Sequence, residues 1–198
     1  MNIAKKTKEY LQNHWLLREA IKKNIANNSK LARLIAKELG LNPAKDFHAV
    51  LVTCRRYAEK LKFTGQEQKI IDLLKKSKLH IKTKLAQVVL EKSLKPSALH
   101  FIRGENSNTI IIESGELEKI KQSYKHGILH VKKDLAEVLI ISPKQVEETV
   151  GVSACLSSLL ADAEINVLTL IGSYDEDIFI IEQKDVAKVL QILDNIIK

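Results

Sequence analysis

The apolar positions of this chain change their spacing near residue 78. Before it, apolar residues recur every three or four positions, as they do along Leu31–Leu39, which is the period of an amphipathic helix. After it, short apolar runs such as Leu135–Ser142 have the length and composition of buried strands. The pattern predicts an all-α N-terminal part, residues 1–77, followed by an α+β part.

Two neighbouring helices stand out in the N-terminal part. The first has Leu31–Leu39 as its apolar stripe, Asn28 or Ser29 as its N-cap and Gly40 as its stop. The second begins near Pro43 and runs to about Leu61. Its predicted core-facing residues are Phe47, Val50, Leu51, Cys54, Ala58 and Leu61. No β-wing is visible beyond Lys62: Phe63–Gly65 is typical of a loop before a further helix, Gln66–Ser77.

A short helix, a tight turn with glycine and a second helix form the layout of a helix-turn-helix. In such modules the outer side chains of the second helix reach bases and phosphates in the major groove of DNA. A helix pair in a structural bundle has the same pattern, so that interpretation stays open. The predicted contacts to double-stranded DNA are Lys45, His48, Thr53, Arg55, Arg56 and Lys60.

The second half contains an internal repeat. Leu79–Leu90 aligns with Leu129–Ile140 at an offset of 50 residues, with six of twelve positions identical. Phe101–Glu113 then aligns with Leu170–Glu182 at an offset of 69, so the second copy has 19 extra residues between its matching blocks. Such self-similarity indicates one structural unit used twice.

The second copy predicts the order β-α-β-β-α. Leu135–Ser142 is followed by a helix from Gly151, by strands at Ile165–Ile171 and Ile178–Ile181 around a Tyr174–Asp177 turn, and by a helix capped by Asp185. The closing strand must come from elsewhere, and both Ile128–Lys132 and Leu79–Lys82 are candidates. The expected topology is ferredoxin-like βαββαβ with helices on one face.

Charge divides the chain in the same way. Residues 1–84 hold 20 Lys and Arg against 7 Asp and Glu, whereas residues 85–198 hold 12 against 17. This asymmetry favours a polyanion as partner of the N-terminal part, although lysines that only solvate helix surfaces also explain it. RNA is the weaker choice because the part lacks the aromatic-rich sheet of single-strand readers.

The chain offers few groups for chemistry. Cys54 and Cys155 form no disulfide framework, and His126 and His130 lack further ligands at metal-binding spacing. No phosphate-binding glycine loop, nucleophile elbow or catalytic triad is visible. We therefore expect no catalytic residues, metal or cofactor, and a protein that is not an enzyme. Since no apolar run suits a membrane span or signal peptide, we expect no membrane partner and a cytoplasmic location.

Residues 134–197 resemble the ACT domain, a small amino-acid-sensing module. The resemblance lies in the apolar first strand, the Gly151–Val152 step that opens a helix, and Leu159–Val167, which matches the family's passage into the second strand. Val150 departs from the proline common there. Residues 85–125 resemble an ACT unit without its first helix. The resemblance implies two ACT-like repeats, the first degenerate over residues 78–127 and the second an ACT domain over 128–198.

The loop before the predicted helix has its own physical case as a ligand site. A glycine there allows backbone N–H groups to approach a ligand, and the helix N-terminus favours a carboxylate. The predicted site for a small amino acid is Gly151, Val152, Ser153, Ile165 and Asn166. The plainer interpretation makes Gly151 a turn and Asn166 a strand-edge cap.

The basic helical part combined with an ACT-like part resembles archaeal regulators of amino acid metabolism. The resemblance implies a transcriptional regulator that binds DNA through its N-terminal helices, binds an amino acid through its ACT domain and forms a homodimer through ACT sheets. The alternative is an ACT interaction protein that regulates or scaffolds a partner enzyme without DNA.

Overall fold

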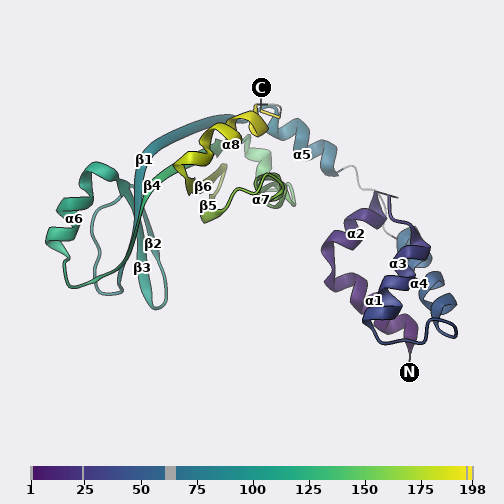
Figure 1. Cartoon of the computed structure of the whole chain (residues 1–198). Coiled ribbons are helices and arrows are strands. Elements are labelled where there is room, and N and C mark those ends of the chain that lie inside the picture. The colour runs from purple at the N-terminus through teal and green to yellow at the C-terminus, as the bar shows by residue number, and fades with distance from the viewer. Residues whose placement is uncertain (1, 24, 61–65, 195, 198) are drawn as a thin grey trace. The chain divides into compact units, whose positions relative to one another are not determined.

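The structure is a computed structural model that describes residues 2–23, 25–60, 66–194 and 196–197. The chain divides into two compact units, Met1–Gln66 and Glu67–Lys198. The first is helical and the second contains the sheet (Figure 1). Among the described residues, no helix has the length and apolar character needed to cross a bilayer.

The first unit contains helices α1 (Ile3–Asn13), α2 (Trp15–Lys22), α3 (Asn28–Glu38) and α4 (Phe47–Lys60). Burial of apolar side chains stabilises their packing. Its fully buried core residues include Leu11 of α1, Ile35 of α3, and Val50 and Cys54 of α4. The helical prediction for this part is confirmed, and so are the positions of α3 and α4 within one to four residues.

Several local predictions for these helices need correction. The N-cap of α3 is Asn27, whose side chain accepts hydrogen bonds from the backbone of Ser29 and Lys30 at 3.0 and 3.1 Å. Leu34 is 40% exposed and lies outside the core. Gly40 follows α3 with φ +61°, the left-handed conformation that ends helices.

The second helix starts later than Pro43. Asn42 accepts hydrogen bonds from the backbone of Ala44 and Lys45, and Asp46 accepts one from the Asn42 backbone, so residues 43–46 form a turn before α4. The predicted end at Leu61 and the predicted loop at Phe63–Gly65 lie outside the described residues.

Helix α5 (Gln66–Leu74) packs with the sheet. Its buried residues Ile70, Leu73 and Leu74 share a core with Val152 and Leu156. The division between the units therefore lies eleven residues before the predicted boundary at 77/78.

The second unit contains one six-stranded sheet with the order β2-β3-β1-β4-β6-β5, in which all neighbouring strands are antiparallel. The two repeats thus share a sheet. The strands are β1 (Lys78–Glu91), β2 (His100–Arg103), β3 (Ser107–Glu113), β4 (Ile128–Ile141), β5 (Val167–Ser173) and β6 (Glu176–Glu182).

The long strands β1 and β4 run side by side through the middle of the sheet (Figure 1). Each changes direction at a residue with positive φ, Lys84 at +59° and Asp134 at +56°, and these two positions are 50 residues apart, like the sequence repeat. Ladder irregularities occur at the same place. Each long strand consequently has two halves with different roles.

Of the two candidates for the closing strand of the second repeat, Leu79–Lys82 is the one that closes it, and Ile128–Lys132 closes the first repeat instead. Residues 78–82 pair with 137–141 and close the half of the sheet that contains β6 and β5. Residues 128–132 pair with 87–90 and close the half that contains β3 and β2. The first half of each long strand thus completes the repeat that the other strand opens.

Helices α6 (Leu117–Ser123), α7 (Val152–Asp162) and α8 (Val186–Leu193) cover one face of the sheet. Short 3₁₀ turns (Ser114–Glu116, Lys144–Val146 and Gln183–Asp185) precede them. The β-α-β-β-α order predicted for the second repeat is confirmed, and residues 92–99 contain no helix. Asp185 stands at the start of α8, but its side chain makes no capping hydrogen bond, contrary to the prediction.

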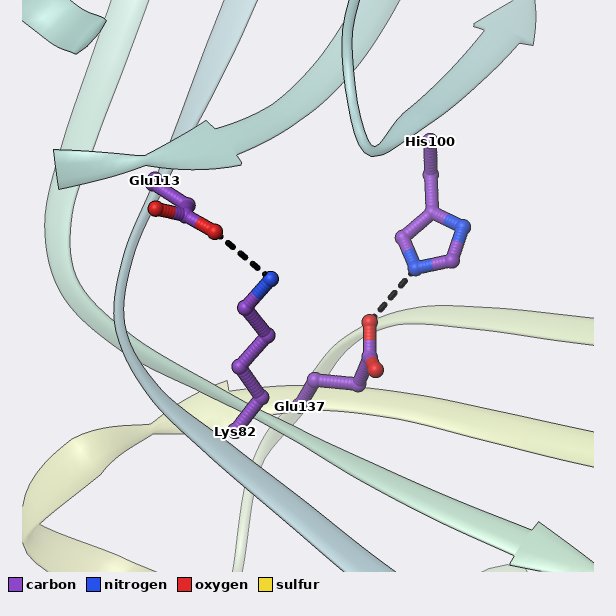
Figure 2. Close-up of polar contacts among 4 residues, drawn as sticks. All are labelled: Lys82, His100, Glu113 and Glu137. Carbon is purple, nitrogen blue, oxygen red and sulfur yellow. Dashed lines mark hydrogen bonds and ion pairs between the residues drawn. The ribbon is translucent and has the colours of Figure 1, made fainter.

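The opposite face of the sheet carries a core made of strand residues alone, including Leu85, Ile111, Leu135 and Ile180, all fully buried. A sheet can bury its own face in this way only if it curls, which follows from the twist of its strands. The polar contacts drawn in Figure 2 lie among these strands: Lys82 to Glu113 at 2.7 Å, and His100 to Glu137.

Candidate functional site

A surface pocket of about 380 Å³ lies where α7 begins. Three segments line it: the loop before α7, the first turn of α7, and the turn between β5 and β6. Its lining residues are Val146, Glu147, Thr149, Gly151, Val152, Ser153, Ala154, Gly172, Ser173, Tyr174, Glu176 and Asp177. This volume accommodates a small metabolite.

Gly151 gives the loop its shape. Its φ of +96° lies in the left-handed region, where a side chain is strained. The first hydrogen bond of α7 runs from the Cys155 N–H to the Gly151 carbonyl at 2.9 Å. The backbone N–H groups of the following residues have no partner within the helix, and Val152 and Ser153 line the pocket. The pocket therefore faces the positive end of α7.

Asp177 of β6 lies in the pocket wall next to the start of α7. Its side chain is 5% exposed, and its Oδ1 accepts a hydrogen bond from the Ser153 hydroxyl at 2.7 Å. This bond joins β6 to the first turn of α7, so the helix start and the strand are held in register. The pocket has a fixed wall on this side.

The structure brings together three of the five predicted ligand residues, Gly151, Val152 and Ser153. Ile165 is 4% exposed in the helix-side core, and its N–H bonds to the Leu160 carbonyl. Asn166 is exposed just before β5, whereas the pocket lies at the far end of that strand, at Gly172 and Ser173. These two residues lie outside the pocket.

Sequence reasoning missed the contribution of the β5–β6 turn. Tyr174, Glu176 and Asp177 were recognised only as a hairpin turn, yet they line the pocket. The strand order could have indicated this contribution. In an antiparallel sheet, the β5–β6 turn and the loop after the neighbouring strand β4 lie at the same end of the strands.

The other repeat carries a different side chain at the position of Asp177. Asn108 lies 69 residues before Asp177 and starts the corresponding strand. It is fully buried, and its amide donates hydrogen bonds to the carbonyls of Lys92 and Leu94, both at 2.9 Å. The segment 92–99, which stands in place of the missing helix, is thus held by Asn108 at the position that Asp177 has in the second repeat.

Most of the predicted DNA-contacting side chains are accessible. Lys45 lies in the turn before α4, and His48, Arg55, Arg56 and Lys60 are exposed along it. Thr53 is half-buried, and its hydroxyl donates to the Ala49 carbonyl at 2.7 Å, so its hydrogen is engaged within the helix.

Cys54 and the potential metal-binding side chains are the remaining reactive groups considered at the sequence level. Burial raises the pKa of the Cys54 thiol to about 11, which keeps it protonated and unreactive near neutral pH. Within the part of the chain that the structure describes, no group of three or more His, Cys, Asp or Glu side chains is arranged to hold a metal ion.

Comparison with known proteins identifies the class of the pocket-bearing module. Residues 130–195 match the family model of the ACT domain. The match covers 66 of the 198 residues and includes α7, β5, β6 and α8. No curated protein matches the chain.

Solved structures show a likeness of fold over a larger share of the chain. Aspartate kinase from Clostridium acetobutylicum superposes with a TM-score of 0.52 at 17% identity, covering 61% of this chain and 34% of that one. The ligand-free regulatory subunit of aspartate kinase from Thermus thermophilus gives 0.50 at 14% identity, covering 61% and 98%. The corresponding subunit from Thermus flavus gives 0.50 at 13% identity, covering 59% and 95%. The chain thus spans about a third of the Clostridium enzyme, and the likeness is one of fold.

Proposed function

We propose that this protein is a non-enzymatic, amino-acid-responsive regulator whose ligand binds in the pocket at the start of α7. The observation that carries the proposal is the left-handed Gly151 beside a cavity at the N-terminus of a helix. The ACT-domain match and the fold shared with regulatory subunits of aspartate kinase support it. The two halves of the sheet are then two ACT-like repeats, of which the first has lost its helix between the first two strands.

The pocket offers complementary groups for the two ends of an amino acid. The N-terminus of α7 suits a carboxylate, because its free N–H groups donate hydrogen bonds and the helix dipole adds positive potential. The acidic side chains of Glu147, Glu176 and Asp177 on the other walls suit an ammonium group.

Thermal unfolding of the full chain with each of the twenty amino acids tests this proposal. A ligand at a hundred times its dissociation constant adds about 2.7 kcal/mol of stability, worth several degrees in a protein of this size. Gly151→Val should abolish the shift, whereas Gly115→Val, where a new Cβ meets nothing within 4 Å, should keep it. If Gly151→Val does not fold, Ala154→Phe crowds the pocket while leaving the backbone unchanged. No shift with any amino acid would refute the proposal.

We further propose that the helical unit binds double-stranded DNA through a helix-turn-helix formed by α3 and α4. Residues 1–66 hold 14 Lys and Arg against 5 Asp and Glu, and the cations on and before α4 are exposed. Arginine and lysine at such positions suit phosphates and guanine edges.

The salt dependence of binding tests the DNA proposal. About six phosphate contacts give a log–log slope of affinity against salt near −5. Exchanging Arg55 and Arg56 for Glu should abolish binding, whereas the same exchange at the exposed Lys6 and Lys8 of α1 should weaken it much less. Equal losses of DNA affinity in the two double variants would indicate nonspecific electrostatic attraction. An affinity for DNA that does not depend on salt would rule out binding through phosphate contacts.

The path from ligand to DNA runs through α5 in this proposal. This helix follows the helical unit in sequence and packs into the same core as α7, where Ile70 and Leu74 share a cluster with Val152. A ligand that orders the start of α7 would also bias α5. Pairing of two sheets along the edge strand β5 would give a homodimer, which sedimentation measurements can detect.

The second candidate is an ACT interaction protein that controls a partner enzyme without DNA. The likeness to separate regulatory subunits of aspartate kinase favours it. A selective amino acid response without salt-dependent DNA binding would support this candidate over the transcriptional one.

A further inference from the structure

Asp177 is a buried acidic side chain that forms no ion pair with the described residues. It is 5% exposed, and its one side-chain hydrogen bond among the described residues comes from the neutral Ser153 hydroxyl at Oδ1. Asp177 lines the pocket, and its Oδ2 accepts no side-chain hydrogen bond from the described residues. Buried carboxylates require compensation by a donor or a cation.

The equivalent position in the first repeat shows what a side chain meets there. Asn108 presents an amide, and its N–H groups meet the carbonyl oxygens of Lys92 and Leu94 from the loop that fills the space. In the first repeat, the hydrogen-bond donors of the Asn108 side chain therefore face acceptors on the segment that contains Lys92 and Leu94. At Asp177 the side chain presents acceptors, so a complementary occupant carries donors.

The rest of the lining determines the sign of the ligand's charge. Glu147 and Glu176 add two more acidic groups, and none of the lining residues is Lys, Arg or His. The N-terminus of α7 offers its positive potential both to the carboxylate of an amino acid and to Asp177, and one helix end does not balance three acidic side chains and a ligand carboxylate. A zwitterion brings one ammonium, whereas a basic amino acid brings a second cationic group.

We propose that the pocket selects an amino acid with a positively charged side chain, and that Asp177 is the residue that binds the cationic group and sets this specificity. The inference rests on the proposed function and adds the class of ligand. The ligand carboxylate lies at the start of α7, and its cationic groups lie toward β6 and the β5–β6 turn.

The first test uses the unaltered full chain and calorimetric titration. L-lysine and L-arginine should bind, whereas L-norleucine, which has nearly the size of lysine without its side-chain ammonium, and L-glutamate should bind at least tenfold more weakly. The expected discrimination corresponds to one lost charge-assisted hydrogen bond.

Asp177→Asn provides the second test. Since Asn occupies the equivalent position in the first repeat, the fold has a precedent for it. The variant should lose affinity for L-lysine about tenfold to a hundredfold and lose its preference over L-norleucine. Asp175→Asn makes the same charge change two residues away, outside the pocket lining, and should leave both unchanged.

The outcomes separate the two proposals. If the protein binds a neutral or acidic amino acid in preference to lysine, and Gly151→Val abolishes this binding, the proposed selectivity for a cationic side chain is wrong. The proposed amino-acid-responsive function would still stand. Unchanged lysine selectivity in Asp177→Asn would overturn the role of Asp177. No binding of any amino acid would overturn both.

Discussion

The imidazole of His100 on edge strand β2 contacts the carboxyl group of Glu137 on β4, with β3 and β1 between them in the sheet. In a flat sheet these strands would lie three spacings, or about 14 Å, apart. The contact therefore exists because the sheet curls over its strand-only core. A related contact joins the other edge: the Thr169 hydroxyl of β5 lies 3.3 Å from the amide oxygen of Gln87 on β1.

We expect His100→Ala to destabilise the protein by about 1–3 kcal/mol, because it removes the partner of Glu137, which is 8% exposed. Chemical denaturation of the full chain measures this loss. Thr169→Val is the matched control at the other edge: it breaks a longer, neutral contact and should cost less than about 1 kcal/mol. Equal losses would show that the His100–Glu137 contact contributes nothing beyond strand packing.

Lys84→Gly should stabilise the protein by up to about 1 kcal/mol. Lys84 has φ +59°, where a side chain costs energy and glycine does not, and its backbone N–H would keep its hydrogen bond to Gln183 at 2.8 Å. Lys78→Gly, at the start of the same strand and without a positive φ, should destabilise instead. The denaturation midpoints of the two variants measure these changes in stability. A loss of stability in Lys84→Gly would contradict the idea that the positive φ of Lys84 is strained.

Glu182 should contribute to acid sensitivity. Hydrogen bonds from Lys132 and Lys184 lower the pKa of its carboxyl group to about 2 from an ordinary value of 4.5. Because the folded state binds the proton more weakly, this contribution is complete above pH 4.5 and is lost as pH falls toward about 2. Glu182→Gln should flatten the stability profile in that window.

Glu118→Gln is the control for that window. Lys121 also lowers the pKa of Glu118, but the pair joins residues three apart on one exposed helix. Its effect on acid denaturation should be smaller. If the two variants show the same profile between pH 2 and 4.5, the cross-strand pair has no special role.

Tyr10 should titrate late in alkali. Burial, together with the hydrogen bond to Glu38, raises its pKa to about 12 from 10.0. Its contribution to stability is therefore complete below pH 10.0 and disappears as pH rises through about 12. Ultraviolet titration should show one late phenolate, absent in Tyr10→Phe and shifted to lower pH in Glu38→Gln.

The internal repeat could be predicted from the sequence, but the exchange of strands between the two copies could not. Matching Leu79–Leu90 with Leu129–Ile140 predicted one unit used twice. The direction change within each copy falls on Lys84 and Asp134, and neither residue type marks a left-handed turn as glycine would. Strand exchange between the copies also depends on pairing between residues 38 to 63 positions apart, which local patterns do not encode.

The site was predictable only where it depends on local chain geometry. Strand, glycine and helix in succession located Gly151–Ser153, because that order makes a loop at a helix N-terminus. Asp177 joins them through the folding of a hairpin, so a single stretch of sequence does not reveal it. Asn166 is near α7 in sequence but lies at the other end of β5.

The exchange of strands determines the smallest fragment of this protein that can fold independently. The family match covers residues 130–195. The strand segment 78–82, which pairs with β4 and completes this half of the sheet, lies some fifty residues earlier in the sequence. A fragment cut at the family boundaries would leave one side of β4 without its partner, and such bare edges invite aggregation. Since α5 also fills its core, an autonomous version must begin before residue 70.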